Sequence, residues 1–176
     1  KILMKLFNMI YLRINSLKAA RVLTIEEFFF PLDILGKWNR AYGKKGFIQY
    51  QFVIPIENSK NGLNEILNFI AEGNFKPFLS VLKLLGKEND NYLSFAQSGY
   101  TLSLDFKIRQ GLNDFLDQLD LIVLKHKGRI YLAKDVRTSE EFFKANYKNA
   151  ELFREYRKQN NMTKTFNSFQ SKRLGI

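Results

Sequence analysis

The chain contains no cysteine and a single histidine, His126. The absence of cysteine excludes disulfides, thiolate catalysis and thiolate metal sites. One histidine argues against a histidine-based metal cluster and against a Ser-His-Asp triad. His126 lies between Lys125 and Lys127 at the expected end of a helix, where the helix dipole explains its position better than catalysis does.

Long apolar runs are also missing. Runs such as residues 28–30 and residues 32–35 are short, and Asp33 interrupts the second. Neither approaches the roughly 18 apolar residues of a membrane-spanning helix. Residues 1–12 lack the small-residue cleavage site of a signal peptide, and the first residue is a lysine. We therefore expect a soluble piece, cytoplasmic or membrane-associated, of a protein whose beginning lies upstream.

Positive charge is in excess, with 28 Lys and Arg against 17 Asp and Glu and a net charge of +11. This balance permits partners that carry phosphate groups. Hydrophobic residues make up 45% and charged residues 26% of the 176 residues, which is a globular composition with a core of about one domain.

Hydrophobic periodicity predicts the secondary structure. We expect helices over residues 2–14 and 32–42, a helix that Ser59 caps and Gly73 ends, a helix that begins near Leu112, and a helical tail that begins at Ser139. The expected strands are residues 47–55, 75–85, 99–106 and 129–132. This order predicts an α+β fold, namely a ferredoxin-like (split βαβ) antiparallel sheet with two helices on one face. An N-terminal helix and loop and a helical C-terminal tail flank it.

The sheet face opposite the two helices is the informative feature. Alternation places the following polar side chains on it: Gln49, Gln51, Lys83, Thr101, Ser103 and Asp105. Amides, hydroxyls and one charge of each sign suit a hydroxyl-rich or phosphorylated ligand. Antiparallel sheets often leave one face to solvent, which is the simpler explanation. Phe47 and Val53 flank the glutamines, however, so the face is expected to be covered.

Several stretches, in order, resemble one family: Phe30-Pro31-Leu32-Asp33, residues 38–43, residues 46–55, residues 83–86, Asp105-Phe106, residues 128–135 and Arg173-Leu174. They resemble the FAD-linked decaprenylphosphoryl-ribose oxidases, members of the wider vanillyl-alcohol-oxidase and aldonolactone-oxidase superfamily. The resemblance covers nearly the whole chain. It implies an FAD-dependent oxidoreductase that oxidises a sugar hydroxyl, on a polyprenyl-phosphoryl pentose, by hydride transfer to flavin.

The resemblance also implies how the chain is organised. Residues 1–46 are the N-terminal part of the substrate domain, residues 47–132 its ferredoxin-like part, and residues 133–176 a helical segment that completes the FAD-binding domain. The sequence has no Gly-rich phosphate-binding loop, so FAD is expected to be bound mainly by an upstream domain. The isolated chain is then expected to be inactive.

Site roles follow from the resemblance. Lys134 resembles the family residue between flavin and substrate, where a cation stabilises the reduced flavin, and Tyr131 one that borders the flavin. Gln49 and Gln51 resemble the pair that faces the substrate, Lys83 its basic wall, and Leu32 and Trp38 its apolar lining. Thr101 and Ser103 stand where some members have Asn and Cys, Phe29 where Tyr is known and Leu85 where Phe is known. These departures leave the exact substrate open and affect the implied reaction class less.

Each of these residues also has a purely structural explanation, such as a surface lysine for Lys134, a strand aromatic for Tyr131 and a core position for Trp38. Two other functions stay open. The first is a ferredoxin-like RNA- or ligand-binding module without catalysis. Against RNA, Thr101, Ser103 and Asp105 stand where an RNA-binding sheet carries aromatics. The second is a partner-binding domain without chemistry. The expected partners are a lipid-phosphate-linked sugar, the upstream FAD-binding domain and a membrane surface, and no nucleic acid.

Overall fold

The computed structural model describes residues 2–17, 20, 22–30, 33 and 36–176. The chain divides into two compact units, Lys1–Ala41 and Tyr42–Ile176. Residues 47–132 and 133–176, expected as separate segments, therefore belong to the same unit. Leu32 lies outside the described residues.

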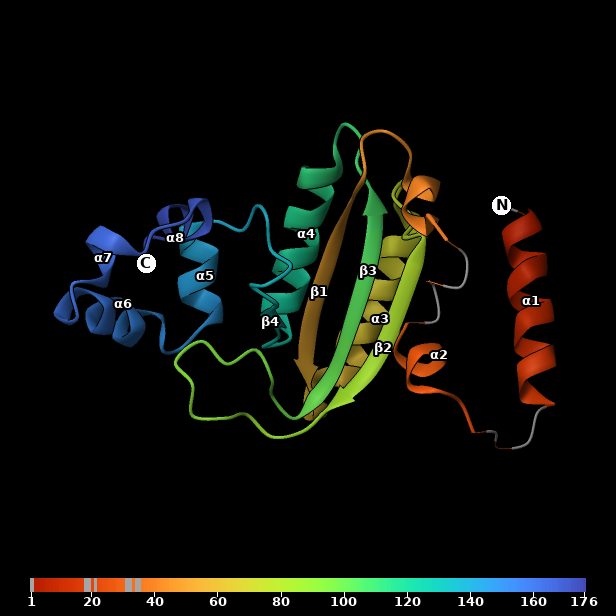
Figure 1. The fold of residues 1–176 in the computed structure, drawn as a ribbon, viewed down its shortest axis with the longest axis horizontal. Helices are drawn as coiled ribbons and strands as arrows, with labels where there is room; N and C mark the ends of the chain where they lie inside the picture. Colours follow the sequence, from red (N-terminus) through yellow and green to blue (C-terminus); the bar gives the residue numbers. More distant parts are fainter. Residues whose placement is uncertain (1, 18–19, 21, 31–32, 34–35) are drawn as a thin grey trace. The chain divides into compact units, whose positions relative to one another are not determined.

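The second unit is built on a four-stranded sheet with the strand order β2-β3-β1-β4. The elements are β1 (Phe47–Pro55), α3 (Ile56–Glu72), β2 (Leu79–Leu85), β3 (Gly99–Lys107), α4 (Leu112–Lys125) and β4 (Arg129–Ile130). All three strand pairs are antiparallel, and Figure 1 shows the helices beside the sheet. The expected α+β class is confirmed, and the order of elements and strands is consistent with the ferredoxin-like arrangement.

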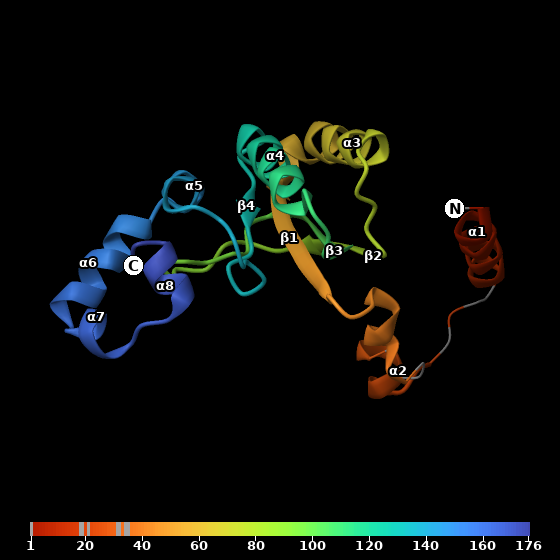
Figure 2. The same ribbon diagram turned by 90° about the horizontal axis from the view of Figure 1, so that it is seen from above.

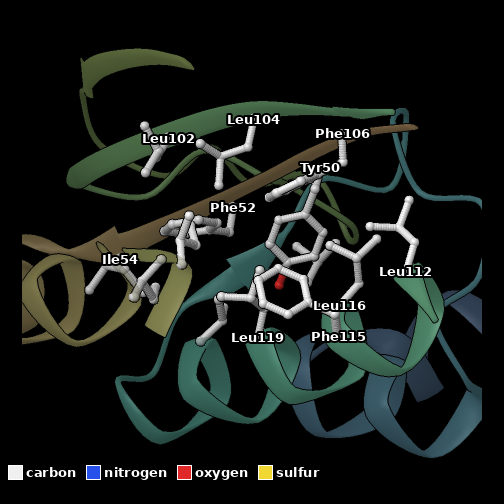
Figure 3. Packing of buried hydrophobic residues seen from close by; sticks show 14 residues of the cluster. Tyr50, Phe52, Ile54, Leu102, Leu104, Phe106, Leu112, Phe115, Leu116 and Leu119 are labelled. Atoms are coloured by element: carbon white, nitrogen blue, oxygen red, sulfur yellow. The ribbon is translucent and has the colours of Figure 1, made fainter. Parts of the chain in front are cut away.

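The core lies between the sheet and the two helices, which occupy one side of the sheet in Figure 2. Every second residue of β1 and β3 points into this core, as Figure 3 shows for Tyr50, Phe52 and Leu104. Alternation places these side chains on one face, and the stripes of α3 and α4 meet them. Phe52 is completely buried, and burial of such a side chain stabilises the fold by about 1.5–3 kcal/mol.

The start of α3 differs from the prediction. Pro55, not Ser59, occupies the N-cap position, and Ser59 lies one turn inside the helix, where its Oγ donates to the Ile56 carbonyl at 2.8 Å. The proline has φ −52° and suits the entry into a helix. The predicted end of the helix at Gly73 is confirmed.

The second strand begins at Leu79 rather than near residue 75. The stretch before it closes the C-terminus of α3, because the Lys76 ammonium donates to the carbonyls of Ile70, Ala71 and Gly73 at 2.5–2.7 Å. Such capping satisfies helix carbonyls that have no intrahelical partner. These residues therefore cannot extend the strand.

The helical tail from Ser139 is confirmed. It comprises α5 (Glu140–Asn146), α6 (Ala150–Gln159), α7 (Met162–Thr165) and α8 (Phe169–Arg173), and the Ser139 side chain accepts from the Phe142 amide at the start of α5. A second cluster contains Phe143, Tyr147, Ala150 and Leu174.

The tail is hydrogen-bonded to β4, which ends after two residues instead of the expected four. Asn146 donates to the Gly128 carbonyl and accepts from the Ile130 amide, both at 2.8 Å. The Tyr147 hydroxyl donates to the Ile130 carbonyl at 2.5 Å. Side chains of the tail thus take the place of a further strand beside β4.

The first unit contains α1 (Ile2–Ser16) and α2 (Ile25–Phe29), and η2 (Trp38–Tyr42) begins in it. The helix expected over residues 2–14 is confirmed. α2 was not predicted, although Thr24 and Glu27 form a capping box at its start. Within the described residues, no helix has both the length and the apolarity needed to cross a membrane.

Candidate functional site

The polar face, defined by Gln49, Gln51, Lys83, Thr101, Ser103 and Asp105, exists as the alternation predicts. In the register, Gln49 lies opposite Asp105, Gln51 opposite Ser103, and Lys83 opposite Thr101. Residues directly opposite each other in an antiparallel pair share a face. All six side chains therefore lie on the side of the sheet away from α3 and α4.

Asp105 is buried and engages two neighbours. Its Oδ1 accepts from Gln49 Nε2 and its Oδ2 from the Tyr42 hydroxyl, both at 2.7 Å. Burial and the Asp105 carboxylate raise the pKa of Tyr42 well above its usual value, so this phenol stays a donor. Tyr42 also stacks on Phe47, with ring centroids 4.1 Å apart. One end of the polar face is therefore covered, and the Gln49 amide is held in one orientation.

The middle of the polar face forms a second chain of hydrogen bonds. Gln51 Nε2 donates to Thr101 Oγ1 at 3.1 Å, and Thr101 donates to the Phe52 carbonyl at 2.8 Å. Thr101 is buried, Ser103 is half-buried, and Lys83 is exposed on the edge strand β2. Thr101 and Asp105 thus orient the two glutamines, whereas Lys83 extends into solvent.

A small hollow brings four of the predicted site residues together: Gln49, Gln51, Tyr131 and Lys134. Its other lining residues are Ile48, Tyr50, Ile130, Asp135, Val136 and Arg137. The enclosed space is about 10 Å³, which is about what one water molecule needs. A ligand larger than a water molecule would therefore rest against the surface of these side chains and not inside the hollow.

Tyr131 and Lys134 reach the hollow because the chain turns where β4 ends. The Tyr131 amide still donates to the Gln51 carbonyl at 2.9 Å, and the Lys134 amide donates to the Tyr131 carbonyl at 3.0 Å. The Tyr131 ring packs against Phe95, with centroids 4.4 Å apart. Lys134 is exposed, so its ammonium is available to a ligand.

Beneath the hollow lies a buried cluster that sequence analysis missed. Asp120 accepts from the Tyr50 hydroxyl at 2.8 Å and from Arg137 Nη2 at 2.7 Å. Burial raises the pKa of Asp120 to about 6, although Arg137 and Tyr50 oppose the shift. A signal was present, because Asp120 follows Leu116 by four residues and precedes Val123 by three, on the buried stripe of α4.

Trp38 is the other predicted site residue that the structure describes. Trp38 is half-buried in η2, and its role in lining the site stays a prediction. Among the described residues, no three His, Cys, Asp or Glu side chains are grouped so that they could hold a metal ion.

Comparison with known proteins adds to this geometry. No family model matches the chain. It is 44% identical over 127 residues to decaprenylphosphoryl-β-D-ribose oxidase of Mycolicibacterium smegmatis, a match that covers 72% of the chain and 27% of the relative. It is 28% identical over 166 residues to an uncharacterized protein in the mprA 5′ region of Streptomyces coelicolor, covering 94% of the chain and 45% of that relative.

The matched segments thus span less than half the length of either relative. The resemblance expected from residues such as 46–55 and 128–135 is confirmed by the first of these matches. The chain is a homologue of decaprenylphosphoryl-β-D-ribose oxidase over most of its own length.

Proposed function

We propose that the chain forms the substrate-side part of an FAD-dependent oxidoreductase that oxidises a sugar hydroxyl of a polyprenyl-phosphoryl pentose. FAD would be bound mainly by a domain upstream of this chain. The printed name of the relative, an oxidase of decaprenylphosphoryl-β-D-ribose, supports the substrate class. The chain would bind and orient the sugar substrate, and the Lys134 ammonium would be the one cation that it contributes to the reaction.

The observation that carries this proposal is the common hollow of Lys134, Tyr131, Gln49 and Gln51. Its lining includes a lysine, a tyrosine and two glutamines whose amides are oriented by hydrogen bonds to β3. Amides that Asp105 and Thr101 hold in place present donors and acceptors to sugar hydroxyls without further reorganisation. The hollow therefore combines polar groups for a sugar with a charge for a redox reaction.

The same residues fit one end of a flavin. When bound, FAD supplies the acceptor for the hydride that leaves the carbinol carbon, and the hydroxyl proton departs as the carbonyl forms. The exposed Lys134 ammonium would lie beside the ring and stabilise its negative charge after reduction. Tyr131, held by Phe95 and by the Gln51 carbonyl, would border the ring.

The alternative of an RNA-binding module has less support. An RNA-binding sheet of this topology presents stacking aromatics on its open face. On β3 the open face instead carries Thr101, Ser103 and Asp105, while Leu102, Leu104 and Phe106 point into the core. Asp105 is an acidic residue at a position where an RNA-binding sheet has no use for negative charge.

A membrane surface is proposed as a further partner because the substrate carries a lipid. Residues 1–25 include Lys1, Lys5, Arg13, Lys18 and Arg21 and contain no acidic residue. From Leu6 onward, the apolar side chains of α1 that the structure describes are exposed, among them Met9 at 60% and Leu12 at 70%. A basic, apolar helix of this kind is typical of binding to anionic lipid surfaces.

The test is the visible spectrum of the full-length protein. We expect flavin absorption bands that bleach when a polyprenyl-phosphoryl pentose is added without oxygen. Lys134→Ala should lower kcat by about 10²–10³-fold, the usual cost of one group that stabilises charge in the transition state. Lys60→Ala is the matched control, since Lys60 is an exposed lysine of α3.

Two results would contradict the proposal. A folded, colourless full-length protein would exclude the flavoenzyme. Normal turnover of Lys134→Ala in a coloured, active protein would remove Lys134 from the reaction and leave the enzyme class intact.

A further inference from the structure

The turn that carries Lys134, residues 131–138, folds around the buried carboxylate of Asp135. Its Oδ1 accepts from Thr138 Oγ1 at 2.6 Å, from the Thr138 amide at 2.9 Å and from the Arg137 amide at 3.1 Å. Burial alone would raise the pKa of Asp135, but the hydrogen bonds from Thr138, Arg137 and Arg173 lower it, so the carboxylate stays ionised. The turn therefore has a negative centre that needs a cation.

Helix α8, at the C-terminal end of the tail, supplies that cation. Arg173 Nη2 donates to Asp135 Oδ2 at 2.8 Å, and Nη1 donates to the Thr138 carbonyl. Gln170 Nε2 donates to the Leu132 carbonyl at 2.6 Å. The two side chains therefore bind the turn before and after Lys134.

α8 is itself well fixed. Leu174, the residue that ends it, is completely buried in the second cluster beside Phe143 and Tyr147. Ser168 and Ser171 form a capping box at its start. β4 is hydrogen-bonded to the same cluster through Tyr147. The second cluster therefore fixes both β4, which precedes the turn, and α8, which binds the turn.

We propose that Arg173 and Gln170 are positioning residues for Lys134. Through them, α8 contributes to the geometry of the site although it does not line the hollow. This inference rests on the proposed function of Lys134. Removing Arg173 leaves a buried, ionised Asp135 without its charge partner. The turn then rearranges, and Lys134 is no longer held at the hollow.

The experiment compares Arg173→Ala, Arg173→Lys and Arg154→Ala in the full-length protein. Arg154 is the matched control, since it donates to the Gly175 carbonyl at 2.6 Å and to Glu140 but not to the turn. Two quantities are measured: amide hydrogen exchange of residues 131–138, which needs no activity, and kcat with the polyprenyl-phosphoryl pentose.

For Arg173→Ala we expect exchange in the turn to rise at least about tenfold. We expect kcat to fall by up to about 100-fold, the cost of a misplaced reacting group, with KM changed less. Arg173→Lys should recover part of both, because it restores a cation beside Asp135. Arg154→Ala should leave both at the wild-type values.

Should Arg173→Ala fail to fold, Gln170→Ala removes the hydrogen bonds to the Leu132 and Asp135 carbonyls without leaving a buried charge unpaired, and it gives the same two readouts. Unchanged exchange in the turn would overturn the inference. So would raised exchange with normal kcat. A wild-type protein without flavin or turnover would instead refute the proposed function, and the exchange data would still decide whether α8 holds the turn.

Discussion

The two units of the chain differ in where their apolar side chains lie. In residues 42–176 these side chains fill two clusters, and the core between the sheet and the helices includes fully buried Phe52, Ile66 and Leu116. In residues 1–41, α2 buries none of its residues. This shorter stretch nevertheless holds half of the exposed large hydrophobic side chains among the described residues.

The difference shows that the number of hydrophobic residues in a segment does not determine how much that segment stabilises the fold. Only apolar area removed from water contributes to the free energy of folding. The exposed apolar side chains that the structure describes in residues 1–41 therefore add little to the stability of the fold, and they are available to another surface. Four experiments can sharpen or break this comparison.

The largest effect is expected in the core of the second unit. Phe52→Ala should lower the free energy of unfolding by about 3–5 kcal/mol, because it removes a fully buried ring and leaves a cavity. Urea unfolding followed by circular dichroism measures the change. A loss below about 1 kcal/mol would mean that the core is much looser than its burial indicates.

The next effect concerns pH, through the buried Asp120 of the second unit. Its pKa is about 6 in the folded chain, against about 3.9 in an unfolded one. Between these values the folded state binds more protons, so this group makes stability fall as pH rises from 4 to 6, by up to about 3 kcal/mol. Asp120→Asn should flatten that part of the curve of urea midpoint against pH. An equal slope in both proteins would assign the dependence to other groups.

A smaller effect should appear at a lipid surface. We expect the full-length protein to co-sediment with vesicles that contain anionic lipid. Leu12→Ala with Ile14→Ala should weaken this binding by about tenfold, since part of two exposed side chains no longer enters the lipid. Leu121→Ala is the control, because Leu121 is 57% exposed on α4 of the other unit. Equal losses in both variants would remove the special role of α1.

The smallest effect is the counterpart of the first. Leu12→Ala should change the free energy of unfolding by no more than about 0.5 kcal/mol, because Leu12 is 70% exposed. The same urea experiment measures it. A loss comparable to that of Phe52→Ala would show that residues 1–41 fold onto a core of their own.

Periodicity was sufficient for the regular elements of the second unit. The alternation in β1 and the stripes of α3 and α4 determined which faces are buried, since burial on one face constrains those sequences most strongly. Boundaries depended on single side chains instead. Lys76 caps the C-terminus of α3, so β2 begins later than predicted. Asn146 and Tyr147 form hydrogen bonds with the backbone of β4, so this strand is shorter than predicted. Contacts between residues distant in sequence leave no periodic signal.

The candidate site was predictable to different degrees. The polar face followed from alternation alone, whereas Tyr131 and Lys134 required the family resemblance, because both lie after the last strand. The groups that hold them were not found. Arg137 reaches Asp120 seventeen residues away, and Arg173 reaches Asp135 from the other end of the tail. Among 28 basic residues, neither arginine stood out.

The brevity of β4 has a consequence for how such a site can change. Only Arg129 and Ile130 pair with β1, and one more backbone hydrogen bond follows, from the Tyr131 amide to the Gln51 carbonyl, so residues 132–138 are not tied to the register of the sheet. Residues can be added to or removed from the segment after β4 without shifting any strand by a position. Because Gln170 and Arg173 hold the turn, the position of the lysine depends on α8 rather than on the strands, and selection or engineering can adapt it to a larger or smaller ligand while the sheet stays as it is.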